Sequence, residues 1–297
     1  MNRKPNLAIL MTCHNRRETT LACLRSLYEQ SSDFDIFLVD DGGTDGTSDA
    51  VKVLYPKVHL LNGTGNLFWV GGMRLAFARA MKFNYPYYLW LNDDTFLEEG
   101  ALSELVNLHQ SLVQKGNSDS IVVGSTRDPI TGKPTYGGAN QSKAWYSNKY
   151  EFLEPKDVLR PCDTMFGNCV LIPQSVVNKV GNLDKDLIHN FGDLDYGLRA
   201  RKVGCTVWIA PGYLASCSKN SVRGSWADTN LPLTKRLKKV LQIKAFPPGP
   251  WAVFNKRHFG LLWFFYWVLP YIRAVIGYRD LSTSPTFCDE VEQPEKI

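Results

Sequence analysis

Short apolar runs alternate with segments of helical periodicity through the first 125 residues, and this alternation constrains the fold more than any other feature of the sequence. The apolar runs, which we expect to be strands, are Leu7–Met11, Asp35–Val39, Val58–Leu61, Tyr87–Leu91 and Ile121–Gly124. The segments between them, which we expect to be helices, are Arg17–Gln30, Thr47–Leu54, Gly71–Phe83 and Glu98–Gln114. Continuous apolar strands separated by amphipathic helices are typical of a parallel sheet covered on both faces.

The pattern is less regular beyond this part. Residues 127–160 show little periodicity and predict irregular structure. Two strands and two helices are expected after it, at Thr164–Ile172, Ser175–Val180, Leu194–Val203 and Thr206–Ala210. We therefore predict an α/β domain with a mostly parallel sheet over residues 1–215, followed by a helical C-terminal extension over 216–297.

Charge is unevenly distributed along the chain. Between residues 211 and 280, eleven Lys and Arg stand against two acids, a net charge of +9, whereas the whole chain carries +5. The segment 235–276 combines these basic residues with many aromatic ones, which favours contact with an anionic membrane surface. Packing on the core or a homodimer interface is the alternative. The last residues, 281–297, are acidic, and we expect them to be loose.

The cysteines and the N-terminus indicate a cytoplasmic protein. The seven cysteines form no C-x-x-C pair, which argues against a disulfide framework or a zinc site. The apolar run near the N-terminus is too short for a signal peptide, and no stretch of about 18 uncharged apolar residues predicts a membrane span. The body of the chain is acidic on balance and shows no nucleic-acid-binding module, so nucleic acid is not an expected partner.

Polar clusters follow three of the predicted strands, and such clusters share one edge of an open α/β sheet. They are Thr12-Cys13-His14-Asn15, Asp40-Asp41 and Asn92-Asp93-Asp94. Acids at a strand end can accept hydrogen bonds from a nucleotide, or can hold a divalent cation that bridges phosphates. Each cluster also has a purely structural interpretation, because Asp and Gly form turns and Asp94 or Thr95 could cap the next helix.

A further acidic stretch, Phe191-Gly192-Asp193-Leu194-Asp195, opens the helix that ends near Val203. Capping and the helix dipole account for Asp193 without any function. Asp195 and Arg199 stand four residues apart and could form an ordinary surface ion pair. No dinucleotide fingerprint, P-loop or nucleophile elbow is present.

Taken together and in order, these motifs resemble the family 2 glycosyltransferases with the GT-A fold. The resemblance spans about residues 7–210 and also includes the stretch G-N-L-F-W-V-G-G-M. It implies a nucleotide-binding part over 1–125 and an acceptor-binding part over 126–215. It implies that Asp193 is the catalytic general base and that Asp94 binds Mg²⁺ or Mn²⁺. It also implies that Asp41 lies where the family binds the base of the nucleotide. The other residues that it points to for the nucleotide sugar are Thr12, His14, Asn66, Arg74 and Asp93. For the acceptor side it points to Gly167, Asn168, Asp195 and Arg199.

The sequence departs from the family pattern at several positions. Asn92 replaces the first acid of the D-x-D motif, and Gly192 replaces the Glu that precedes the base. Phe68 replaces a family glycine, and Arg74 replaces an asparagine. Cys217 and Ser218 lie where a histidine is often found, and this weakens the metal assignment.

The resemblance predicts an inverting transfer from a UDP- or dTDP-sugar to a hydroxyl of a glycan or lipid-linked glycan in surface polysaccharide synthesis, such as O-antigen or capsule. A positioned carboxylate would take the acceptor proton, and a divalent metal would neutralise the leaving diphosphate. The alternatives are a nucleotidyltransferase acting on sugar phosphates and a catalytically inactive protein that binds carbohydrate or nucleotide. The enzyme would work in the cytoplasm or peripherally on the cytoplasmic face of a membrane.

Overall fold

The computed structural model describes residues 5–30, 33–143, 149–219 and 223–276. The acidic tail expected at 281–297 lies outside the described residues. The chain divides into two compact units, a larger one that runs to Ser218 and a smaller one from Lys219 onward. Each unit is described by itself.

The larger unit is built on a mixed sheet with the strand order β3-β2-β1-β4-β11-β6-β12-β5, and β9 pairs with β12. Its first four strands run parallel to one another, and they are β1 (Leu7–Cys13), β2 (Phe34–Asp40), β3 (His59–Asn62) and β4 (Tyr87–Leu91). The next strand in the sheet, β11, runs antiparallel to β4 and to β6, whereas β12 runs parallel to β6. The bounds of the remaining strands are β5 (Phe96–Leu97), β6 (Ser120–Arg127), β9 (Arg160–Cys162), β11 (Cys169–Pro173) and β12 (Thr206–Ser216).

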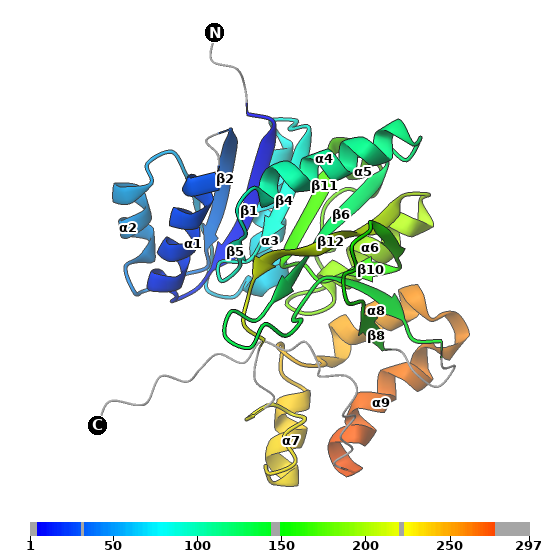
Figure 1. Cartoon of the computed structure of the whole chain (residues 1–297). Helices are drawn as coiled ribbons and strands as arrows, with labels where there is room; N and C mark the ends of the chain where they lie inside the picture. Colours follow the sequence, from blue (N-terminus) through cyan, green and yellow to red (C-terminus); the bar gives the residue numbers. More distant parts are fainter. Residues whose placement is uncertain (1–4, 31–32, 144–148, 220–222, 277–297) are drawn as a thin grey trace. The chain divides into compact units, whose positions relative to one another are not determined.

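Helices cover both faces of this sheet (Figure 1). The bounds of those in the larger unit are α1 (Arg17–Gln30), α2 (Thr47–Leu54), α3 (Phe68–Met81), α4 (Ala101–Gln114), α5 (Gln174–Val180) and α6 (Gly192–Lys202). A second, small sheet has the order β10-β7-β8, with bounds β7 (Gly138–Gln141), β8 (Tyr150–Phe152) and β10 (Thr164–Met165). This arrangement confirms the predicted α/β class.

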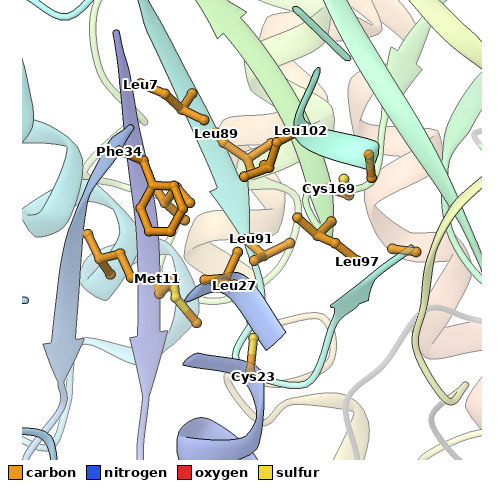
Figure 2. Packing of buried hydrophobic residues seen from close by; sticks show 14 of the residues in the cluster. Leu7, Met11, Cys23, Leu27, Phe34, Leu89, Leu91, Leu97, Leu102 and Cys169 are labelled. Carbon is orange, nitrogen blue, oxygen red and sulfur yellow. The ribbon is translucent and has the colours of Figure 1, made fainter. Parts of the chain in front are cut away.

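The core follows from the alternation of side chains along each strand. In β1, Leu7, Ile9 and Met11 join a buried cluster with residues of α1 and α4, including Leu27 and Leu102 (Figure 2). The intervening residues of β1 point to the opposite face of the sheet, where α3 packs. Burial of each leucine in this core stabilises the fold by about 2 kcal/mol. The strong apolar character of these strands is therefore explained by cover on both faces.

Aromatic rings fill the core on the α3 side. The ring centroid of Phe77 in α3 lies 5.2 Å from that of Tyr88 in β4. The ring of Tyr196, from α6, meets Trp90 of β4 edge-on with centroids 4.9 Å apart. These contacts attach both α3 and α6 to β4, the strand that precedes the Asn92-Asp93-Asp94 cluster.

Three expectations from the sequence need correction. The strand expected at Thr164–Ile172 is two strands, β10 and β11, because the chain turns at 166–168 to bring a backbone N–H to Asp193. The region 127–160, expected to be irregular, contains β7 and β8. The helix expected to begin at Gly71 begins at Phe68. The sheet also contains strands that run antiparallel to their neighbours, namely β11, β5 and β9, and no local pattern reveals their direction.

The smaller unit contains α7 (Leu233–Val240), α8 (Pro248–His258), a 3₁₀ turn η1 (Gly260–Leu262) and α9 (Trp263–Ile276). The proline run at 247–250 does not end a helix but opens α8, since proline fits the first helical turn, where no intrahelical N–H bond is lost. Within the part of the chain that the structure describes, we find no helix with the length and apolar character needed to cross a bilayer.

Candidate functional site

The carboxyl ends of β1, β2 and β4 lie side by side at one edge of the main sheet, because β1 pairs in parallel with both of the others. Just past β2, Asp41 donates its N–H to the carbonyl of Cys13 at 2.9 Å. Just past β4, Asn92 donates its N–H to the carbonyl of Asn168 at 3.2 Å. The predicted polar clusters are therefore held at the edge where open α/β sheets bind ligands.

Asp41 is 4% exposed, and its carboxylate is engaged by backbone N–H groups. Its Oδ1 accepts a hydrogen bond from the N–H of Gly65 at 2.8 Å, and its Oδ2 accepts bonds from Leu67 and Phe68 at 2.8 and 2.9 Å. A Cβ at Gly63 would lie 2.4 Å from Oδ1, so this position needs glycine. Asp41 thus holds the loop that leads into α3. Its contact with a nucleotide base stays a prediction.

The other predicted nucleotide contacts near β1 differ in exposure. Thr12 lies against α3, where a Cβ on Gly72 would come within 2.1 Å of the Thr12 Oγ1. His14 is exposed and donates from Nδ1 to the carbonyl of Asp41 at 2.7 Å. Asn66 is exposed in the loop before α3. His14 and Asn66 are accessible to a ligand, whereas Thr12 also serves the packing of α3 on β1.

Phe68 is the residue that replaces a glycine of the family pattern, and its backbone conformation is unusual. Its φ is 52°, in the left-handed region that glycine adopts at no steric cost. The backbone at Phe68 therefore has a conformation that glycine adopts readily and that a bulky side chain adopts rarely. The ring of Phe68 contacts that of His189 edge-on, with centroids 5.9 Å apart, and this contact helps to hold the strained residue.

Asp93 and Asp94 meet the guanidinium of Arg16, which follows β1. Arg16 Nη1 lies 3.3 Å from Asp93 Oδ1, and Nη2 lies 2.9 Å from Asp94 Oδ2. Thr20 donates its hydroxyl to Asp93 Oδ2 at 3.2 Å. Burial raises the pKa of Asp93, Arg16 opposes that rise, and the neighbouring carboxylate of Asp94 adds to it. Asp93 is thus a buried partner of Arg16, whereas the Asp94 side chain remains 28% exposed.

Cys217 lies directly beside Asp94, in the place that the sequence assigned to a histidine in relatives. Its thiol donates to Asp94 Oδ1 at 3.6 Å, and it accepts a bond from Asn168 Nδ2 at 3.7 Å. Cys217 follows β12 and is 2% exposed. The end of β12 therefore completes the surroundings of Asp94 with a thiol in place of an imidazole.

Trp69, near the start of α3, connects the β4 end with the loop before β11. Its Nε1 donates to Asn92 Oδ1 at 2.7 Å. Its ring lies so close to the backbone of Gly167 that a Cβ there would fall 2.5 Å from a ring carbon. Its backbone N–H donates to His189 Nδ1 at 3.4 Å. A run of contacts thus leads from Asp94 through Cys217 and Asn168 to Asn92, and from Asn92 through Trp69 to Gly167.

Asp193 is the end of this run. Its Oδ2 accepts the N–H of Gly167 at 2.9 Å, and its Oδ1 accepts that of Leu194 at 2.8 Å. Burial raises the pKa of Asp193, and the two backbone hydrogen bonds partly oppose this rise. A carboxylate with a raised pKa is a better proton acceptor near neutral pH than an ordinary aspartate.

The position before Asp193 also has a structural reason. A Cβ on Gly192 would lie 2.5 Å from a methyl carbon of Val70 in α3. The Glu of the family pattern would have no room at this backbone position. Close packing of α6 against α3 therefore accounts for Gly192.

Asp195, Arg199 and Arg74 serve the fold rather than the sheet edge. Asp195 is fully buried, and its Oδ2 accepts a bond from Arg199 Nε at 2.7 Å, so the pair is not the surface ion pair considered from spacing. The Nη groups of Arg199 donate to the carbonyls of Val180 and Asn182, both at 2.9 Å. Arg74 Nε donates to the carbonyl of Leu183 at 3.2 Å. Roles of these residues toward a substrate stay predictions.

A family model described as glycosyl transferase family 2 matches residues 8–181, which is more than half of the chain. The chain belongs to glycosyl transferase family 2. Assignment to this family agrees with the order of motifs read from the sequence, and it makes the protein a glycosyltransferase.

Two relatives of this family 2 enzyme match it at low sequence identity. It is 25% identical over 205 residues to an uncharacterized protein of Mycobacterium bovis, covering 67% of this chain and 69% of that one. It is 26% identical over 202 residues to an N-acetylglucosaminyl-diphospho-decaprenol L-rhamnosyltransferase of Mycobacterium tuberculosis, covering 59% and 62% of the two chains. Both matches span more than half of each protein at low identity.

Two solved structures share the fold. A mannosyltransferase of Pyrobaculum calidifontis, in complex with GDP-Man and Mn²⁺, has a TM-score of 0.53 and 14% identity over 93% of this chain and 73% of the other. GalNAc-T7, solved with UDP, GalNAc and Mn²⁺, has a TM-score of 0.58 and 13% identity over 86% and 51%. These similarities confirm the GT-A fold of the family 2 enzyme.

The chemistry of the acid cluster can be compared with what a divalent cation requires. A Mg²⁺ ion that bridges phosphates keeps several waters and takes one or two protein carboxylates. Within the described ranges, no group of three or more His, Cys, Asp or Glu side chains forms a complete cage. Asp94 offers one partly exposed carboxylate, and Asp93 lies next to it. This donor set fits a cation shared with a diphosphate, which Asp94 would hold.

Sequence reasoning missed three side chains that the structure brings to this site. Arg16 directly follows the first polar cluster, but its partners are 77 and 78 residues away, and no local pattern predicts that contact. Trp69 lies within the stretch G-N-L-F-W-V-G-G-M, which resembles the family motif. The available signal was its place directly after Phe68, which replaces a family glycine. Cys217 was noted only as a missing histidine, although a residue at that position is expected to face Asp94.

Proposed function

We propose that this family 2 enzyme is an inverting glycosyltransferase that moves a sugar from a UDP- or dTDP-sugar to a hydroxyl of a lipid-linked glycan. The observation that carries the proposal is the continuous run of contacts from Asp94 to Asp193. It supports a single reaction site, with a place for a diphosphate at one end and a proton acceptor at the other. Asp193 acts as the general base, and Asp94 serves the diphosphate side.

The reaction needs one proton acceptor and one leaving group. The acceptor hydroxyl oxygen attacks the anomeric carbon while the bond from that carbon to the diphosphate oxygen breaks. The electron pair leaves with the nucleoside diphosphate, and the hydroxyl proton passes to an Asp193 carboxylate oxygen. The N–H groups of Gly167 and Leu194 orient that carboxylate. Direct attack in one step inverts the configuration at the anomeric carbon.

A divalent cation held by Asp94 would neutralise the charge that develops on the leaving diphosphate. The chain itself places His14 and Asn66 at the exposed surface near this site, where they are available to the nucleotide. Asn92 is already engaged by Trp69 and therefore orients the indole rather than a metal ion. This division leaves Asp94 as the carboxylate for the cation.

The acceptor class is supported by a relative and by the smaller unit. The Mycobacterium tuberculosis relative is named as a transferase that acts on an N-acetylglucosaminyl-diphospho-decaprenol. In the smaller unit, large apolar side chains stand exposed on η1 and α9, with Leu261 100%, Phe264 58% and Phe265 41% exposed. Such an acceptor is anchored in a bilayer, so a membrane-facing surface would bring the enzyme to its substrate.

Basic residues accompany these apolar side chains. Lys256 Nζ lies 4.6 Å from the ring centroid of Trp263, and α7 carries four Lys and Arg within Leu233–Val240. Each basic residue near an anionic membrane is worth about 1 kcal/mol. We therefore propose peripheral contact of residues 235–276 with an anionic bilayer. A homodimer through the same side chains is the competing outcome.

The test of the catalytic assignment is the variant Asp193→Asn. Nucleotide sugars are screened with lipid-diphosphate acceptors for release of the nucleoside diphosphate, and calorimetry measures nucleotide binding. The asparagine cannot accept the proton, so we expect turnover to fall by about a thousandfold with nucleotide binding retained. Asp186→Asn, a change at an exposed acid in the preceding loop, should leave both unchanged. Full turnover of Asp193→Asn would overturn the assignment.

Membrane contact is tested by flotation with vesicles that contain phosphatidylglycerol. The double variant Leu261→Ser/Phe264→Ser should lose most of the vesicle binding. Ile130→Ser changes a 91% exposed apolar residue of the larger unit and should retain it. Mass photometry of the same variants detects a dimer. Loss of a dimer without any vesicle binding in the wild type would replace the membrane proposal with a subunit interface.

A further inference from the structure

One guanidinium serves both acids of the Asp93-Asp94 pair. Arg16 Nη1 and Nη2 reach Asp93 and Asp94 at 3.3 and 2.9 Å, while 40% of the Arg16 side chain remains exposed. Arg16 carries the positive charge at the position where the proposed function requires a divalent cation. Because Asp94 is the predicted cation ligand, its ion pair with Arg16 has to be considered when a metal ion binds.

The two acids hold Arg16 in different ways. Asp93 has 6% of its side chain exposed and is anchored by the hydroxyl of Thr20, so it cannot leave its place. Asp94 has 28% of its side chain exposed. The backbone next to Arg16 is fixed, because the Arg17 N–H donates to Asp45 Oδ2 at 2.8 Å. Release of Asp94 therefore requires rotation of the Arg16 side chain and leaves the backbone in place.

We propose that Arg16 and a divalent cation compete for Asp94, so that Arg16 closes the cation position in the donor-free enzyme. This inference rests on the proposed function, in which Asp94 holds the cation. The guanidinium and the metal ion are both cations that would approach the same carboxylate, and two positive charges so close together repel each other. A planar guanidinium also matches a diphosphate well, so an arriving donor gives Arg16 an alternative partner and frees Asp94.

The competition predicts that removing Arg16 strengthens metal binding. Free Mn²⁺ is measured by electron paramagnetic resonance in titrations of the donor-free protein. We expect Arg16→Ala to bind Mn²⁺ about tenfold more tightly than the wild type, because the adjacent carboxylates then lack their counter-ion. Arg17→Ala removes the same charge one residue away and should bind Mn²⁺ as the wild type does. Equal Mn²⁺ affinity of the wild type and Arg16→Ala overturns the proposal, as does absence of binding to both.

Two further variants assign the effect to Asp94. The double variant Arg16→Ala/Asp94→Asn should lose the gained affinity, and Arg16→Lys should restore most of the wild-type weakness because an ammonium retains the charge. A gain that persists without the Asp94 carboxylate would contradict the competition.

The movement of Arg16 has its own signal. The Nε–H resonance of Arg16, assigned by its loss in Arg16→Lys, should shift when Mg²⁺ is added to the wild type and should stay in place in Asp94→Asn. An unchanged resonance at saturating Mg²⁺ would contradict displacement. These measurements need no turnover, so they remain informative if the transfer reaction itself is disproved.

Discussion

Two pairs of adjacent aspartates lie at the carboxyl ends of β2 and β4, the strands on either side of β1 in this family 2 enzyme, and their carboxylates have different partners. In the Asp40-Asp41 pair after β2, the Asp41 carboxylate accepts three backbone N–H groups. In the Asp93-Asp94 pair after β4, the carboxylates contact a flexible side chain, that of Arg16. The sequence presents both pairs as acids at a strand end, and the structure distinguishes them by their partners.

The comparison shows which acid is available to a ligand. Backbone donors cannot move without changing the fold, so Asp41 is committed to the loop ahead of α3. An arginine side chain can rotate away, so Asp94 can exchange its partner. Acids that look alike in a sequence can therefore be separated by asking whether their hydrogen-bond donors belong to the backbone or to a side chain.

The largest effect on stability is expected for Asp41→Ala. Loss of the carboxylate leaves three N–H groups of a partly buried loop without their acceptor, and we expect the free energy of unfolding to fall by about 3 kcal/mol. Urea unfolding measures this loss. Asp49→Ala, at an acid whose side chain is 86% exposed, should change the value by less than about 0.5 kcal/mol. If the two variants unfold alike, Asp41 is not committed to the loop.

Asp94→Ala is expected to give the opposite result. Its ion pair with Arg16 is partly exposed, so unfolding should change by less than about 1 kcal/mol. Sugar transfer in the presence of Mn²⁺ should fall by about a hundredfold, a loss of transition-state stabilisation that initial rates measure. Glu98→Ala breaks an exposed ion pair with Arg127 that has the same 2.9 Å separation, and it should leave transfer unchanged. Equal rates for both variants would remove Asp94 from the site.

Gly72→Ala tests the packing of α3 on β1, the strand that lies between β2 and β4. Its new Cβ would lie 2.1 Å from Thr12 Oγ1, so we expect the variant to lose about 2 kcal/mol of unfolding free energy through overpacking of α3 against β1. Gly71→Ala is the matched change, since the nearest atom to its new Cβ belongs to the Leu67 side chain, at 3.1 Å. Thermal unfolding should separate them, and a neutral Gly72→Ala would mean that β1 and α3 adjust freely.

A third aspartate extends the comparison to protonation. Burial raises the pKa of Asp193, and a base works only when deprotonated, so activity should be lost as the pH falls through this raised value. The acidic limb of the kcat/KM profile should therefore lie above the ordinary aspartate pKa of about 3.9. Rates of the wild type at a series of pH values measure the limb. A limb at or below the ordinary value would contradict the assignment of Asp193 as a buried base.

Local patterns were sufficient for much of the fold. The bounds of α1, α2 and β4 agree with those expected from periodicity and apolar runs, because α1 is long, β4 is strongly apolar and α2 has apolar residues at helical spacing. The antiparallel direction of β11 was not predictable, since strand direction depends on the path of the whole chain. The break between β10 and β11 was also missed, because it depends on a hydrogen bond between Gly167 and Asp193.

The site was predictable as a set of segments but not as a set of contacts. Motif order identified Asp94 and Asp193 as candidates, and the comparisons confirmed the family behind that order. The partners of these acids come from distant parts of the chain, such as Arg16 and Cys217 for Asp94. A short sequence motif contains no information about partners that are distant in the chain. The difference between Asp41 and Asp94 could therefore not be predicted from the motifs.

The fit of the Trp69 ring on Gly167 limits how this enzyme can be redesigned. A loop grafted at 166–168 from another protein has to keep glycine at its centre, or the tryptophan has to be replaced by a smaller residue at the same time, since an added methyl would overlap the ring. Trp69 also donates to Asn92. Substitutions at positions 69, 92 and 167 are therefore not independent, and libraries that vary these three positions together are the appropriate starting point.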